Sequence, residues 1–262
     1  MNPTLRQLPP KRSFWHRFTL SLAIILALFV VVPAARADNE LDEYINDYTV
    51  YSPYVIQGQS EIELRAAAYR DSSLVLDDLN GQVLSVAHSF TSWWKTELYL
   101  GEYTQLPRQP SNLVAYEFEN TFQLAPPGEY WADPGFLLSY EFKTHLSQAN
   151  ELEFGPLFEK HSGRFDQRLN LIWEREIGTG AARGYVFRSA YSLSYRVTPL
   201  FAPGVEVYLH PNANQYQSGP VVYGEYASDS GNELEYSAGV VFGMNAHAPD
   251  KTFMLRLEYE FF

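Results

Sequence analysis

Thr252–Phe262 reads TFMLRLEYEFF, and this C-terminal stretch decides the fold class. Every second residue is apolar, and the residues between them include three charges: Phe253, Leu255, Leu257, Tyr259 and Phe261 alternate with Met254, Arg256, Glu258 and Glu260. Successive side chains of a β-strand point to opposite faces, so this spacing predicts a strand with one apolar and one charged face.

The same alternation recurs upstream, with turn residues such as Pro126-Pro127-Gly128 between the segments. The alternating segments are 61–65, 84–87, 94–100, 114–122, 136–142, 151–159, 168–174, 185–196, 205–210, 221–226 and 235–242. With the C-terminal segment they make about twelve strands. An even number of alternating segments of roughly ten residues is typical of a transmembrane up-and-down β-barrel with antiparallel strands.

The composition excludes several other classes of protein. The 262 residues are 46% hydrophobic and 16% aromatic, which is incompatible with intrinsic disorder. The chain has no cysteine, so disulfides, thiolate metal sites and a cysteine nucleophile are excluded. A net charge of −12 argues against nucleic acid as a partner, because nucleic-acid binders present basic surfaces.

The N-terminal 37 residues have the layout of a secretory signal peptide. A basic start with Arg6, Lys11, Arg12 and Arg17 precedes an apolar run over 18–32, and Ala35-Arg36-Ala37 provides small residues around a cleavage site. We therefore expect cleavage after Ala37. The alternative is an uncleaved anchor helix, but this apolar run is shorter than the roughly 20 residues needed to cross a bilayer.

Residues 38–58 form an acidic N-terminal segment with Asp38, Glu40, Asp42, Glu43 and Asp47. We expect this segment either in the periplasm or tucked into the barrel lumen. The barrel itself is expected over 59–262.

A soluble barrel or sandwich would also show alternation, with its apolar face turned inward. Two features favour a membrane barrel. Twelve strands closed into one soluble barrel would leave an interior too wide for side chains to fill. Aromatic residues also gather near the ends of the segments, as in Trp93-Trp94, Tyr130-Trp131 and Phe261-Phe262, which suits the two membrane interfaces.

The C-terminal strand, which ends in Phe262, resembles the assembly signal of Gram-negative outer-membrane β-barrel proteins, including small porin-like ones. The resemblance extends over 59–262 as a class rather than to one family. It implies an outer-membrane location, contact with outer-membrane lipid and recognition by the barrel-assembly machinery through Phe262. We further expect a monomer.

Counting strands from a periplasmic start predicts the topology. Turns near 91–93, 125–131, 161–164, 199–203 and 228–232 are expected on the periplasmic side. Loops near 71–81, 104–111, 143–150, 176–183, 211–217 and 244–250 are expected on the outer side. None of the outer loops is long.

If the apolar face meets lipid, the charged face lines the lumen, and its acids outnumber its bases. The predicted lining residues are Glu61, Glu63, Arg65, Glu97, Glu117, Glu119, Glu141, Glu151, Glu153, Arg168, Arg188, Arg196, Arg256 and Glu258. This pattern predicts a small passive channel for small hydrophilic solutes, with a weak cation preference. Arg188 and Arg196 share the eighth strand, so a basic strip is expected opposite an acidic wall. The alternative is a structural or interaction barrel whose charges pair and plug the lumen.

A lipid hydrolase is a third hypothesis. His145 and Ser147 have the i, i+2 spacing that places both side chains on one face of a strand, as in outer-membrane lipases. However, Glu159 would lie too far down the barrel to orient the histidine, and Gln148 replaces the asparagine that follows the serine in those lipases. No enzymatic activity is expected. The histidines lie on separate segments without ligand spacing, so neither a metal nor another cofactor is predicted.

Overall fold

A computed structural model describes residues 43–71, 78–145, 148–228 and 231–262. The expected signal peptide, 1–37, and the first residues of the acidic segment lie outside the described residues.

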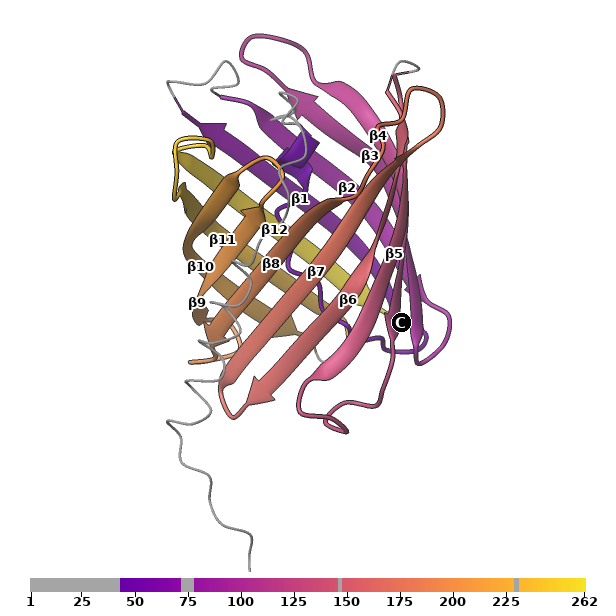
Figure 1. Ribbon diagram of the computed structural model, residues 1–262. Helices are drawn as coiled ribbons and strands as arrows, with labels where there is room; N and C mark the ends of the chain where they lie inside the picture. Colours follow the sequence, from indigo (N-terminus) through magenta and orange to yellow (C-terminus); the bar gives the residue numbers. More distant parts are fainter. Residues whose placement is uncertain (1–42, 72–77, 146–147, 229–230) are drawn as a thin grey trace, which may run out of the picture. The chain divides into compact units, whose positions relative to one another are not determined.

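The described chain is an all-β closed barrel of twelve antiparallel strands, preceded by one short 3-10 helix, η1 (Figure 1). Each strand pairs with its neighbours in the sequence, and β1 pairs with β12 to close the barrel. The bounds are η1 Glu43–Asn46, β1 Ser60–Arg70, β2 Asn80–Ser89, β3 Trp94–Gln105, β4 Asn112–Gln123, β5 Asp133–Lys143, β6 Asn150–Ser162, β7 Phe165–Ile177, β8 Val186–Tyr195, β9 Ala202–His210, β10 Gln215–Ala227, β11 Glu233–Gly243 and β12 Lys251–Phe261.

The predicted strand number and the predicted division of turns and loops between the two ends of the barrel are confirmed. The end of the barrel at which β1 begins and β12 ends, here called the near end, has its turns at 90–93, 124–132, 163–164, 196–201 and 228–232. The opposite or far end has its loops at 71–79, 106–111, 144–149, 178–185, 211–214 and 244–250.

The two faces of the wall differ as the alternation requires. On β4, Phe118 is 44% exposed, whereas its neighbours Glu117 and Glu119 are 7% and 1% exposed. The outer face presents apolar residues on other strands too, for example Leu64, Leu98 and Leu255. An apolar outer surface around a buried charged interior is the arrangement of a barrel that spans a membrane, since only the outside then meets hydrocarbon.

Exposed aromatic side chains lie toward both ends of this apolar surface. Trp93, Tyr130 and Trp131 are exposed at the near end, and Phe142 and Tyr185 at the far end. Tyr and Trp favour the boundary between hydrocarbon and headgroups, so these residues delimit the membrane-facing zone. None of the described helical residues forms a helix long and apolar enough to cross a membrane.

The pairing of β3 departs from simple alternation. Its register with β2 shifts between Leu84 and Ser85, and its register with β4 shifts on both sides of Glu102. A β-bulge inserts one residue and so reverses the inward and outward order beyond it. Glu102 is consequently buried, at 7% exposure, although it falls outside the predicted lining.

Candidate functional site: the barrel lumen

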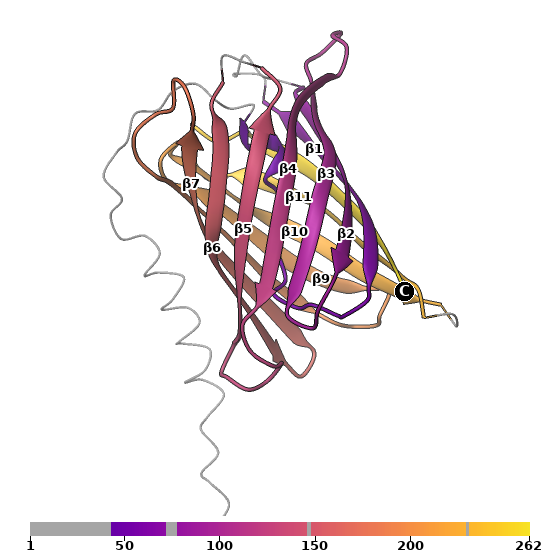
Figure 2. The ribbon, with the colours of Figure 1, turned by 90° about the vertical axis from the view of Figure 1, so that its right-hand side faces the viewer.

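Residues 43–58, here called the luminal strap, run inside the barrel from the far end to the near end (Figure 2). At the far end, Ile45 of η1 packs against Ala67, Tyr69 and Leu79. At the near end, the Gly58 amide donates to the Ser89 carbonyl over 2.8 Å. Of the two placements expected for the acidic segment, its described part takes the luminal one.

The middle of the strap is hydrogen-bonded to side chains of the wall. The Asn170 amide, on β7, bonds both backbone groups of Tyr51: its Oδ1 accepts from the Tyr51 N–H over 2.7 Å, and its Nδ2 donates to the Tyr51 carbonyl over 3.0 Å. Arg65 of β1 donates to the Thr49 hydroxyl over 2.7 Å. The strap is therefore fixed to opposite sides of the barrel.

Toward the near end, three more contacts continue this series. Ser52 donates to Glu159 over 2.6 Å, and Tyr54 donates to Asp133 over 2.5 Å. The Val55 amide donates to the side-chain oxygen of Gln123 over 2.9 Å. These wall residues belong to β4, β5 and β6.

Two residues of the strap fill apolar pockets on opposite walls. Val50 packs with Ala190, Tyr208 and Val241. Tyr51 packs against a second pocket, formed by Leu137, Leu157 and Ile172.

Tyr48 anchors the strap nearer the far end. Its hydroxyl donates to Gln217 of β10, on the wall opposite the pocket of Tyr51.

The lumen has an acidic wall on β3 to β7. Its buried carboxylates are Glu97, Glu102, Glu117, Glu119, Glu141, Glu151, Glu153 and Glu174, with Asp133 and Glu159 closer to the near end. Several are satisfied by neutral donors, since Ser85 donates to Glu97, Ser139 to Glu117, and Tyr99 to Glu119 over 2.8 Å. Neutral donors stabilise a buried carboxylate without cancelling its charge.

Arg188 and Lys143 form ion pairs with carboxylates of this acidic wall. Arg188 of β8 forms ion pairs with Glu153 and Glu174, and its Nε lies 3.9 Å from Asp47 of the strap. The Lys143 Nζ lies 2.7 Å from Glu141 and 3.6 Å from Glu151. The predicted basic strip on the eighth strand therefore does not stand free, because Arg188 is enclosed by carboxylates.

The opposite wall, on β8 to β12 and β1, has a mixed charge and borders a cavity of about 120 Å³ beside the strap. Arg65 and Arg256 of this wall and Arg168 of the neighbouring β7 line the cavity together with Glu206, Glu225, Glu235 and Glu258. This polar space is large enough for several water molecules. The strap therefore separates an acidic wall from a mixed wall that borders open space.

Toward the near end, carboxylates on neighbouring strands also lie directly opposite one another. Glu260 of β12 is paired in register with Glu61 and Glu233, and Glu258 with Glu63 and Glu235. Opposed carboxylates repel one another unless cations intervene. Lys95 lies 2.9 Å from Glu61, and Arg256 lies 3.1 Å from Glu63 and also pairs with Glu258.

The predicted lining residues fall into two groups. Those on the strands point into the lumen and are buried or half-buried. Arg196 differs, because β8 ends at Tyr195 and its side chain is 59% exposed in the turn that follows, 4.0 Å from Glu225. It lies at the near-end rim of the cavity rather than on the strand wall.

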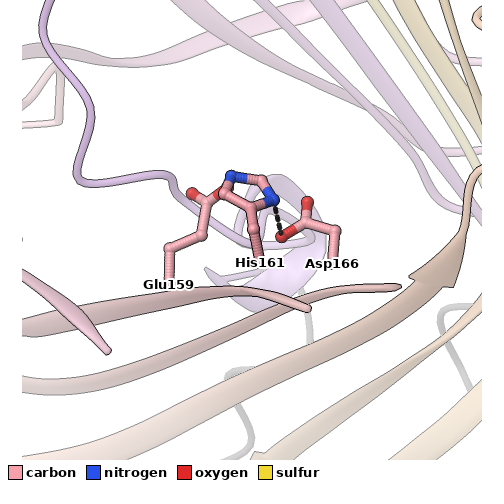
Figure 3. Close-up of side chains that lie close together, drawn as sticks. All are labelled: Glu159, His161 and Asp166. Atoms are coloured by element: carbon pink, nitrogen blue, oxygen red, sulfur yellow. Dashed lines mark ion pairs between the residues drawn. The ribbon is translucent and has the colours of Figure 1, made fainter. Parts of the chain in front are cut away.

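Glu159, His161 and Asp166 come together at the near end (Figure 3). The His161 Nε2 lies 3.0 Å from Glu159, its Nδ1 lies 3.3 Å from Asp166, and its ring stacks on that of Tyr54. Arg168 lies 3.3 Å from Glu159 and 3.5 Å from Asp166. A guanidinium already neutralises these carboxylates. The arrangement therefore favours an ion-pair cluster that fixes the end of the strap, rather than a metal site.

Sequence reasoning missed the strap tyrosines and the residues that bind them. Neither Asn170 nor Tyr99 is charged, so a search for charged lining residues passes over both. Both residues alternate in step with the charged residues of β7 and β3, and this position could have indicated that they face the lumen. Of the hydrolase pair, His145 lies in a far-end loop, and Ser147 lies outside the described residues.

No protein-family model and no curated protein matches the chain. An outer-membrane channel from Pseudomonas putida F1 is 13% identical with a TM-score of 0.48, over 79% of this chain and 96% of its own. A BenF-like porin from Pseudomonas fluorescens Pf-5 is 8% identical with a TM-score of 0.26, over 79% and 99%. Acinetobacter baumannii OccAB2 is 9% identical with a TM-score of 0.25, over 80% and 99%. At these values none of the three bears on what this chain does.

Proposed function

We propose that the protein is a narrow passive channel for water and small hydrophilic solutes in the outer membrane of a Gram-negative cell. The observation that supports this function is the polar cavity beside the strap, lined by unlike charges within a closed membrane-spanning wall. The polar groups of such a lining can take the place of the water molecules that hydrate a small solute in bulk solution.

The channel has a weak preference for cations. The acidic wall places more carboxylates than basic groups around the lumen, and a low-dielectric barrel wall focuses their field inward. Arg65, Arg168 and Arg256 lie beside the cavity and offset part of that field. The preference therefore remains modest and falls as salt screens it.

The near end faces the periplasm in this proposal. A signal peptide cleaved after Ala37 exports the chain, and Phe262, which closes the C-terminal sequence, is read by the barrel-assembly machinery. The exposed apolar belt contacts outer-membrane lipid, and the closed barrel needs no second copy to complete its wall. The protein acts as a monomer without a cofactor.

Planar-bilayer recordings of the purified full-length protein test the channel function. We expect small, stable conductance steps, and in liposome-swelling assays faster entry of small sugars and amino acids than of larger ones. Absence of both conductance and swelling from correctly folded protein would reject the channel.

The second candidate function is a non-conducting structural or interaction barrel. The specific observation in its favour is the strap, which occupies the lumen along its length and is bonded to β1, β4, β5, β6 and β7. The two functions differ in one respect that can be measured, because only the channel conducts while the strap is in place.

A further inference from the structure

Side chains of the luminal wall form hydrogen bonds with the main chain of the strap. Asn170 presents one acceptor and one donor to the N–H and C=O of the same residue, Tyr51. Gln123 accepts from the Val55 amide four residues further along, and its own amide nitrogen donates to the Ala125 carbonyl. A side-chain amide that bonds both backbone groups of one residue can bind an extended chain whatever side chains that chain carries, as a neighbouring β-strand does.

The wall also accommodates side chains on alternate sides of this backbone. Val50 enters the pocket of Ala190, Tyr208 and Val241, while the next residue, Tyr51, enters the pocket on the opposite wall. Main-chain bonds combined with pockets for alternating side chains are the features of a site that binds an extended peptide.

Glycines occur at two positions where the strap lies close to the wall. A Cβ atom at Gly135 would lie 2.5 Å from the Cβ of Pro53, and one at Gly81 would lie 2.5 Å from Oδ1 of Asn46. Real Cβ atoms do not approach other atoms so closely, so any larger residue would force the strap to move. The wall is thus shaped for a chain along this path.

From these contacts we propose that the lumen contains a peptide-binding site, on Asn170, Gln123 and the two apolar pockets, whose occupant in this structure is the chain's own residues 48–55. This inference rests on the proposed channel function and deepens it, because a displaced strap leaves a site for an extended oligopeptide along the permeation path. The strap occupies the site without a competitor because its covalent attachment gives it an effective concentration in the millimolar range or above.

The site is tested in the full-length protein by loosening the strap and supplying its sequence in trans. The variant Val50→Asn/Tyr51→Asn places uncharged polar groups in the two apolar pockets and leaves every wall residue intact. The probe is a fluorescent peptide with the sequence of residues 47–57, and its binding is followed by anisotropy in detergent. The control peptide has the same composition in scrambled order.

We expect the native-sequence peptide to bind the loosened variant at least tenfold more tightly than it binds the wild type, and the scrambled peptide to bind neither. Adding Asn170→Leu to the loosened variant removes two neutral hydrogen bonds and weakens peptide binding by about ten- to thirtyfold. Equal binding of the two peptides, or no effect of Asn170→Leu, overturns the site.

Binding and conduction are measured separately, so the two proposals fail separately. A loosened variant that binds peptide yet passes no current retains the peptide site and removes the channel. A loosened variant that conducts but binds no peptide retains the channel and removes the peptide site. Should Val50→Asn/Tyr51→Asn fail to give a folded barrel, Val50→Gly/Tyr51→Gly removes the same pocket contacts without adding polar groups.

Discussion

The two walls of the lumen differ in how their charges are satisfied. On the acidic wall, β3 to β7, carboxylates such as Glu117 and Glu119 are buried and bonded to Ser139 and Tyr99. On the mixed wall, Arg65 and Arg256 border the same open space as Glu206, Glu235 and Glu258. The strap separates the two. The difference indicates that the carboxyl groups of the acidic wall are enclosed, whereas the mixed wall borders the open space that we propose as the route of a solute.

The largest effect is expected where the two walls are joined through Arg188. The change Arg188→Met leaves Glu153 and Glu174 buried without their cation and removes the contact with Asp47. Breaking one partner of a buried ion pair costs about 3–5 kcal/mol. The measurement is the free energy of unfolding by urea in detergent or lipid.

Arg196→Met is the matched control, because it removes the same charge from an exposed turn. Its effect on the free energy of unfolding should stay within about 0.5 kcal/mol. Equal losses for the two variants would show that Arg188 does not hold the walls together.

A smaller effect is expected at Gly135, where the wall is close to the strap. In Gly135→Ala the added methyl group meets Pro53 at 2.5 Å, so the strap must shift. Overpacking of this kind costs about 1–3 kcal/mol, and we expect conductance to rise because the near end of the strap loosens. Single-channel recording measures the change.

Gly101→Ala provides the comparison for Gly135→Ala. The atoms nearest to a methyl group there belong to the side chains of Tyr103 and Leu113. Conductance should stay at the wild-type value. A rise in both variants would attribute the effect to the barrel wall itself.

The smallest effect concerns the acidic wall behind the strap. Glu117→Gln/Glu119→Gln removes two charges and should lower cation preference only in part, because other carboxylates of that wall remain. In the Val50→Asn/Tyr51→Asn background the same pair should lower it further, since the wall is then no longer shielded. Zero-current potentials in a salt gradient measure both effects, and an equal reduction in the two backgrounds would remove the distinction between the walls.

The barrel was predictable from the sequence because alternation reports directly which face of a strand meets lipid. The C-terminal TFMLRLEYEFF and the turn residues therefore predicted the strand number, the topology and the inward position of residues such as Glu63 and Glu153. Glu102 escaped the prediction because a bulge in β3 interrupts the period.

The strap was not predictable in the same way. Residues 43–58 have no period of two, and their conformation depends on contacts with residues more than a hundred positions away, such as Asn170. Composition showed an acidic segment and left its position open. Arg196 continues the phase of β8, but the strand ends one residue earlier, since pairing with β9 reaches only as far as Ser194.

The zero-current potential of the wild-type protein tests the central claim of an acid-dominated, conducting lumen most directly. Recorded across a salt gradient near about 0.1 M, where the Debye length is about 10 Å, the potential should have the sign of a weak cation preference and should approach zero as salt rises toward about 1 M. A potential of the opposite sign at low salt would show that anions pass preferentially, and would contradict the claim that luminal carboxylates govern the current.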